Sequence, residues 1–165
     1  MPFRTQLIPF LVLVVTIVFD QVTKILIVRA FQQGDILPVI DGFFSLTLHY
    51  NPGVAFGMFA DWAEPGRTFI LTGAKMFALG LCLFLLRKHY QHSLPGQIAL
   101  ALIIGGAIGN IIDRAHLGHV VDFLDFYVRD YHWPTFNIAD SAICIGVVLL
   151  LFVPERKCAP QPKAG

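Results

Sequence analysis

The chain has 165 residues, of which 56% are hydrophobic and only 14% are charged. These polar residues are too few to cover the surface of a water-soluble protein of this size. The composition therefore indicates a membrane protein. Twelve Lys and Arg residues nearly balance eleven Asp and Glu residues, which argues against a basic nucleic-acid surface and against an acidic tail.

Four apolar segments are candidates for membrane-spanning helices: residues 7–28, 68–86, 94–112 and 138–153. A helix needs about 20 residues to cross about 30 Å of hydrocarbon. The fourth segment is short, so its first turn, with Asn137 and Asp140, is expected near the interface. We therefore predict a mainly α membrane protein with four transmembrane helices.

The first segment could instead be a cleaved signal peptide, because it follows a short N-terminus that contains Arg4. However, no small-x-small cleavage motif follows it, and apolar residues resume after Lys24. Asp20 and Lys24 are one helical turn apart, so we expect them to form an ion pair that faces the interior of the bundle. This pattern favours a membrane helix that is retained.

The connection at residues 30–67 contains a predicted strand. Residues 44–50 alternate apolar and polar with period two, as a half-buried strand does, and Asn51-Pro52-Gly53 ends the pattern. We expect a small extracytoplasmic β-sheet that rests on the outer leaflet. Its expected interfacial anchors are aromatic: Trp62, Tyr127, Tyr131 and Trp133.

The distribution of positive charge favours cytoplasmic termini. An even number of spans places both termini on one side, and the side with more Lys and Arg is normally cytoplasmic. The residues on the termini and second connection are Arg4, Arg87, Lys88, Arg156, Lys157 and Lys163, against Arg29, Arg67, Arg114 and Arg129 on the other side. The connections at 30–67 and 114–136 then face outward. We expect one domain over residues 1–157 and a disordered cytoplasmic tail over 158–165.

The third apolar segment combines a packing motif with a polar cluster. Gly105 and Gly109 have the GxxxG spacing that lets membrane helices approach closely. Asn110, Asp113 and Arg114 follow on one helical face at the outward end. We interpret these three residues mainly as a structural polar network.

Two carboxylates flank the last part of the third connection. With Asn137 as the N-cap, Asp140 would occupy the third helical position, where capping alone could explain it. Asp122 lies in the apolar run Val-Val-Asp-Phe-Leu, so desolvation is expected to raise its pKa. Two carboxylates that share one proton can hydrolyse a peptide bond: one activates water, and the other protonates the carbonyl or the leaving amine.

Other hydrolytic chemistries lack their residues. None of the three serines lies in a GxSxG motif, and no HExxH is present. The three cysteines, Cys82, Cys144 and Cys158, are odd in number and form no CxxC pair, which argues against a disulfide framework and against cysteine-based zinc or redox chemistry. His116 and His119, near Asp113 and Asp122, could in principle hold zinc, but we expect neither a metal nor a cofactor.

Five motifs occur in order along residues 20–146: DQVTK at 20–24, NPGVAF at 51–56, GGAIGNIIDR at 105–114, GHVVDF at 118–123 and FNIAD at 136–140. Together they resemble the bacterial lipoprotein signal peptidases, also called signal peptidase II. The resemblance implies an aspartyl endopeptidase of the bacterial cytoplasmic membrane. Such an enzyme removes signal peptides from prolipoproteins by cutting before a diacylglyceryl-modified cysteine.

The resemblance also implies roles for individual residues. Asp122 and Asp140 take the places of the catalytic pair. The supporting and substrate-positioning places are taken by Asp20, Lys24, Asn51, Gly53, Asn110, Asp113, Arg114 and Asn137. Lys75 and the residues after Pro154 receive no role. We expect membrane lipids and prolipoproteins as partners, no nucleic acid, and a monomer.

Two other functions remain open at this point. Asp20, Lys24, Asp113 and Asp140 could form the relay of a small proton-coupled carrier. Against this function, the polar residues gather toward one face, and the chain shows no inverted repeat. A non-catalytic scaffold could use the same carboxylates only for capping and pairing.

Overall fold

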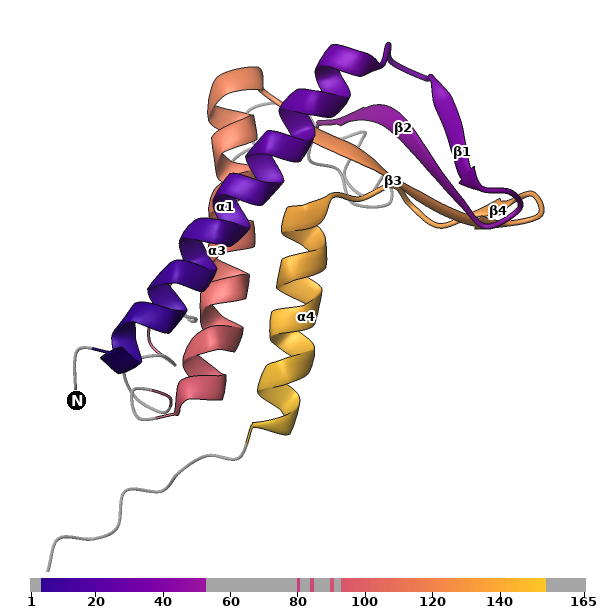
Figure 1. Ribbon diagram of the computed structural model, residues 1–165. Helices are drawn as coiled ribbons and strands as arrows, with labels where there is room; N and C mark the ends of the chain where they lie inside the picture. Colours follow the sequence, from indigo (N-terminus) through magenta and orange to yellow (C-terminus); the bar gives the residue numbers. More distant parts are fainter. Residues whose placement is uncertain (1–3, 53–79, 81–83, 85–89, 91–92, 154–165) are drawn as a thin grey trace, which may run out of the picture.

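The computed structural model describes residues 4–52, 80, 84, 90 and 93–153 (Figure 1). The elements follow in the order α1 (Arg4–Ala30), β1 (Ile36–Ile40), β2 (Phe44–Asn51), α3 (Leu94–Leu117), β3 (Val120–Val128), β4 (Tyr131–His132) and α4 (Ile138–Phe152). The helix predicted at 68–86 lies outside the described residues, as do Gly53, Trp62, Lys75 and the predicted tail.

Three of the four predicted apolar helices lie within the described residues. Two stretches, Leu7–Ala30 in α1 and Leu94–Leu117 in α3, are long and apolar enough to cross a membrane. The third helix, α4, is apolar but has only 15 residues. Large side chains such as Phe10, Val15 and Leu151 are exposed, and acyl chains would cover such a surface. The described helices are thus those of a mainly α protein with membrane character.

Glycines of α3 allow its neighbours to pack closely against it, as the GxxxG spacing predicts. A Cβ atom added to Gly105 would lie 3.0 Å from Cβ of Thr16 in α1, and one added to Gly109 would lie 2.5 Å from Oδ2 of Asp20. A Cβ at Gly106 would collide with the carbonyl oxygen of Ala139 in α4. The absence of these side chains lets both α1 and α4 pack closely against α3, and Gly109 faces both of them.

We expect Gly106→Ala to lower the free energy of unfolding by about 1 to 3 kcal/mol, which is the usual cost of overpacking. The added methyl group meets the rigid backbone of α4 rather than a flexible side chain. Thermal unfolding in detergent micelles measures the change. Gly80→Ala is the matched control, because a Cβ there would meet no atom of the described residues within 4 Å. Equal stability of the two variants would contradict this packing account.

A four-stranded antiparallel sheet, in the order β1-β2-β3-β4, lies at one end of the helices (Figure 1). The predicted strand at 44–50 is confirmed as β2. At this end of the helices α1 and α3 finish and α4 begins, so both predicted outer connections meet there. A core of Ile27, Leu48, Val121 and Phe123 fastens the sheet to the end of α1.

The register between β2 and β3 determines which side chains face the helix ends. It places His49 opposite Asp122 and Asn51 opposite Val120, with an irregularity in the pairing between Leu46 and His49. Such a bulge adds a residue to one strand and re-aims the side chains beyond it. The ends of β2 and β3 therefore bring Asn51 and Asp122 to the same place.

Two of the predicted aromatic anchors are exposed on the sheet. Tyr131 is 72% exposed and Trp133 is 57% exposed. Tyr127 instead stacks on the ring of His132, with ring centroids 4.9 Å apart. The exposure of Tyr131 and Trp133 is consistent with a place at the membrane interface.

Candidate active site

Asp122 is a buried carboxylate on β3 that receives two amide hydrogen bonds. It is 1% exposed and is the third residue of β3, between the buried residues Val121 and Phe123. Asn137 Nδ2 donates to Oδ1 over 2.7 Å, and Asn51 Nδ2 donates to Oδ2 over 2.9 Å. Both asparagines were predicted as supporting residues, and they come from β2 and from the N-terminal end of α4.

Asp140 lies in the first turn of α4, where Asn137 is the N-cap as predicted. Oδ1 of Asn137 accepts the backbone N–H of Asp140 over 2.9 Å. The carboxylate of Asp140 points to α3 instead of capping α4: its Oδ1 accepts a hydrogen bond from Asn110 Nδ2 over 2.8 Å. Capping alone therefore does not explain the direction of this side chain.

Two asparagines connect the carboxylates of Asp122 and Asp140. Asn137 Nδ2 donates to Asp122 and also lies 3.3 Å from Oδ1 of Asn110, whose own Nδ2 donates to Asp140. The amide of Asn137 can have only one orientation, because its oxygen must accept a backbone N–H. The pair is thus held by groups from β3, α3 and α4 in one polar cluster.

Burial raises the pKa of the Asp122 carboxyl from 3.8 to about 6. The hydrogen bond from Asn51 opposes this rise, and the neighbouring charge of Asp140 adds to it. The predicted effect of the apolar setting on Asp122 is confirmed. The repulsion from Asp140 is the interaction that two carboxylates sharing a proton would have.

We expect the stability of the protein to fall as pH rises from about 4 to about 6 because of Asp122. Its pKa is raised in the folded state, so the folded protein binds this proton more tightly than the unfolded chain does. The contribution is fully present below about pH 4 and is lost as pH rises through about 6. Its size is about 3 kcal/mol, since a tenfold change in proton affinity corresponds to about 1.4 kcal/mol.

Unfolding of wild type and Asp122→Asn in micelles at several pH values between 4 and 7 isolates this contribution. The difference in the free energy of unfolding between the two proteins should change by about 3 kcal/mol across this range. A difference that does not depend on pH would show that Asp122 has an ordinary pKa in the folded protein.

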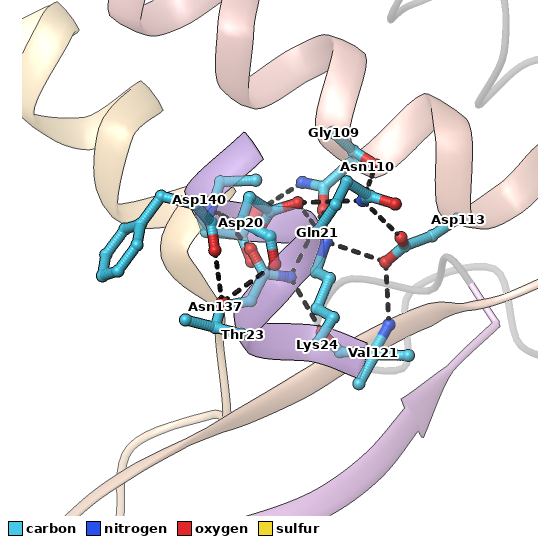
Figure 2. Close-up of polar contacts among 12 residues, drawn as sticks. Asp20, Gln21, Thr23, Lys24, Gly109, Asn110, Asp113, Val121, Asn137 and Asp140 are labelled. Carbon is cyan, nitrogen blue, oxygen red and sulfur yellow. Dashed lines mark hydrogen bonds and ion pairs between the residues drawn. The ribbon is translucent and has the colours of Figure 1, made fainter. Parts of the chain in front are cut away.

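The predicted ion pair of Asp20 and Lys24 is confirmed, and Asp113 joins it (Figure 2). Lys24 Nζ lies 2.8 Å from Oδ2 of Asp20 and 2.7 Å from Oδ2 of Asp113. It also donates to Oδ1 of Asn110 over 3.1 Å. The three charged groups are almost fully buried. Lys24 therefore neutralises carboxylates on two helices and contacts the cluster around Asp140.

Arg114 lies in the last turn of α3 and brings a positive charge to the two carboxylates. Its Nη1 donates to the backbone oxygen of Asn110 over 3.2 Å, and its charge acts on Asp140, Asp122 and Asp113. Its Nε is buried and has no hydrogen-bond partner in the part of the chain that the structure describes. A buried guanidinium N–H with no partner could donate a hydrogen bond to an oxygen atom of a bound molecule.

All predicted site residues that the structure describes gather in this region. They are Asp20, Lys24, Asn51, Asn110, Asp113, Arg114, Asn137, Asp122 and Asp140. Gly53 lies outside the described residues. The described residues contain no group of three His, Cys, Asp or Glu side chains suited to hold a metal ion. The ring of His119 lies instead against Tyr50, with centroids 4.3 Å apart.

The sequence analysis missed two polar groups. Gln21 donates to Asp20, Asp113 and the carbonyl of Gly109. Its place three residues before Lys24, on the same helical face, was the available signal. Asp125 is buried on β3, and both of its oxygens lie within 3.0 Å of Nδ1 of His132 on β4. That pair fastens the β3–β4 hairpin and does not contact Asp122 or Asp140 through any described hydrogen bond.

Comparison with known proteins gives consistent matches. Residues 12–154 match the family described as Signal peptidase (SPase) II. A lipoprotein signal peptidase from Geobacter sulfurreducens is 47% identical over 148 residues, which is 88% of this chain and 91% of that protein. One from Ralstonia nicotianae is 50% identical over 144 residues, covering 87% and 82%. A bacterial membrane enzyme solved by the in meso method at 1.9 Å resolution has a TM-score of 0.76 and 36% identity, covering 87% of this chain and 89% of that one.

Proposed function

This chain belongs to the signal peptidase II family of aspartic peptidases, and we propose that Asp122 and Asp140 are its catalytic pair. As a lipoprotein signal peptidase, it removes signal peptides from prolipoproteins. One observation carries the proposal for the pair. Among the described residues, the buried carboxylate of Asp122 and the partly buried carboxylate of Asp140 are linked to each other through Asn137 and Asn110.

In the proposed mechanism Asp122 is the ionised member of the pair. Both of its oxygens accept amide hydrogen bonds, which favour the charged form. It takes a proton from water as the water oxygen attacks the scissile carbonyl carbon. Asp140, which receives one hydrogen bond from Asn110, carries the shared proton and donates it as the tetrahedral intermediate forms. The carbon–nitrogen bond then breaks as Asp122 gives the proton that it took from water to the leaving nitrogen. Asp140 takes back the proton from the hydroxyl group as the new carboxyl group forms, which restores both carboxylates to their starting state.

Arg114 is proposed to position the substrate. Its buried Nε has no partner among the described residues, and its charge lies near both carboxylates. A carbonyl oxygen of the substrate backbone would satisfy this donor, and the positive charge would favour an oxyanion that develops nearby. Asn51 and Asn137 hold Asp122 in place while this happens.

We further propose that the substrate bond is the one before a diacylglyceryl-modified cysteine. Acyl chains hold such a cysteine at the membrane interface, and the proposed pair lies where α3 ends, α4 begins and the sheet starts (Figure 1). Anchoring in the membrane would orient the peptide bond before reaction, which can supply a large part of the rate enhancement. No metal or other cofactor has a part in this mechanism.

The proposed topology follows from the same arrangement. Four spans, including residues 68–86, would cross the bacterial inner membrane, with both termini cytoplasmic and the sheet on the outer leaflet. The excess of Lys and Arg near the termini supports this direction, and exposed Tyr131 and Trp133 suit the interface. We propose a monomer formed by one domain over residues 1–157, with a disordered cytoplasmic tail over 158–165.

Cleavage by the purified protein in detergent tests the substrate assignment. The substrates are one prolipoprotein with the diacylglyceryl group on its cysteine and the same prolipoprotein without it. Mass spectrometry should show one cut, directly before the modified cysteine, and little product from the unmodified chain. Equal cleavage of both chains, or cleavage at another bond, would contradict the assignment of the lipid-modified cysteine.

A further inference from the structure

One buried carboxylate holds the backbone directly before each member of the proposed catalytic pair. Oδ2 of Asp113 accepts the backbone N–H of Val121 over 3.2 Å, and Val121 precedes Asp122. Oδ1 of Asp20 accepts the backbone N–H of Ala139 over 2.9 Å, and Ala139 precedes Asp140. The same type of contact therefore fixes the backbone from which each of the two proposed catalytic side chains extends.

Gln21 and Lys24 join these two carboxylates to each other. Gln21 Nε2 lies 3.2 Å from Oδ2 of Asp20 and 2.9 Å from Oδ1 of Asp113, and Lys24 contacts both carboxylates. The two side chains are three residues apart on one face of α1. Lys24 supplies one positive charge for two negative ones, and Gln21 adds N–H donors without adding charge.

Gly109 makes room for this arrangement on α3. Its carbonyl oxygen also lies 3.1 Å from Gln21 Nε2, so the two N–H groups of that amide are shared among three acceptors. A Cβ atom at Gly109 would lie 2.5 Å from Oδ2 of Asp20, closer than real Cβ contacts allow. The close approach of α1 to α3 therefore lets Gln21 reach carboxylates on both helices at once.

We infer that Gln21 is a positioning residue for peptide hydrolysis, because it ties Asp20 to Asp113 and thereby sets the separation of Asp122 and Asp140. The inference rests on the proposed assignment of those two residues as the catalytic pair. Two carboxylates share a proton only at close range, and a misplacement of about 1 Å can cost about 10²-fold in rate. Lys24 bridges the same groups, but its removal would also leave buried charges unpaired. Gln21 can be changed without that effect.

The test compares Gln21→Met with Thr23→Val in cleavage of the lipid-modified prolipoprotein. Methionine keeps the length of the side chain and removes the donors. Thr23 is the matched control, since within the described part of the chain its hydroxyl donates only to carbonyls of its own helix, at Phe19 and Asp20. We expect Gln21→Met to lower kcat about 10- to 100-fold with little change in KM, and Thr23→Val to behave as wild type.

The pH profile separates positioning from a general loss of folded protein. If the carboxylates move apart, their repulsion weakens and the two apparent pKa values of the pair approach each other, so the bell-shaped profile of kcat becomes narrower. A loss of folded protein lowers the height of the profile and leaves its width unchanged. The other charged groups around the pair are Lys24, Asp20, Asp113 and Arg114, and exposed His49 is the strand partner of Asp122. All of them stay the same in both variants.

Gln21→Asn provides a second variant that keeps a polar group in the buried site. Its amide is one methylene shorter and cannot span both carboxylates, so the same fall in kcat and the same narrowing are expected. The inference would be overturned if Gln21→Met had the kcat and the profile width of wild type. If Gln21→Met does not fold, the same result in Gln21→Asn would overturn it. Normal cleavage by Asp122→Asn would instead overturn the proposed catalytic pair, so the two failures are distinguishable.

Discussion

Asp122→Asn and Asp140→Asn are each expected to lower kcat for the lipid-modified prolipoprotein by about 10²- to 10⁴-fold, the range for loss of a general acid or base. An amide can neither take a proton from water nor hold the shared proton. The shape of the site changes little, because asparagine has nearly the same volume. Rates are measured with matched amounts of folded protein in detergent, after size-exclusion chromatography.

Asp125→Asn is the matched control for these variants. Asp125 is a buried carboxylate on the same strand as Asp122, but it pairs with His132 of the hairpin. We expect it to keep most of the wild-type kcat, although the hairpin should be less stable. If Asp125→Asn is as inactive as Asp122→Asn, the loss reflects the sheet as a whole rather than the proposed pair.

Lys24→Met is expected to lower the free energy of unfolding by about 3 to 5 kcal/mol, the usual cost of removing one partner from a buried ion pair. Methionine fills similar space but leaves Asp20 and Asp113 without their shared counterion. Both carboxylates are at most 3% exposed, so water cannot replace the ammonium group. Thermal unfolding in micelles, or unfolding with SDS, measures the change.

The double variant Lys24→Met/Asp113→Asn distinguishes lost charge balance from lost packing. The second substitution removes the charge of Asp113, which Lys24→Met leaves buried without a counterion. The double variant should therefore regain part of the stability that Lys24→Met loses. An unchanged or additive loss would indicate that the lysine stem, rather than its charge, stabilises the bundle. Cleavage should remain low in both variants, since Lys24 also donates to Asn110 beside Asp140.

Much of the fold could be predicted from local patterns in the sequence. Three apolar runs form helices, and the alternation over residues 44–50 forms β2. The strand at Val120–Val128 was not predicted, because its apolar residues do not alternate with polar ones. Most of its first half is buried on both faces, and a continuous apolar run does not distinguish such a strand from other buried structure.

The members of the site could be predicted, but many of their partners could not. Spacing within one helix predicted the pair of Asp20 with Lys24 and the cap of Asn137 on Asp140. The second partner of Lys24 is Asp113, which lies on another helix, so no local pattern contains it. The contacts of Gln21 with α3 and of Asp125 with His132 likewise depend on tertiary structure and hairpin register.

Family membership decides between the functions that the sequence left open. A peptidase, rather than a carrier or a scaffold, accounts for the whole chain. The geometry also explains why the protein buries so many polar groups despite the cost of their desolvation. Asp20 and Asp113, which Lys24 bridges, accept the backbone N–H groups of the residues before the proposed pair, as a preorganised site requires.

The central claim is that Asp122 and Asp140 act as one catalytic unit, and a double-mutant cycle in single-turnover cleavage tests it most directly. The cycle compares wild type, Asp122→Asn, Asp140→Asn and the double variant on the same lipid-modified substrate. Residues that act as a unit are strongly non-additive, so the double variant should lose no more activity than the worse single variant. Losses that multiply would mean that the two carboxylates act independently, which would contradict the shared-proton mechanism.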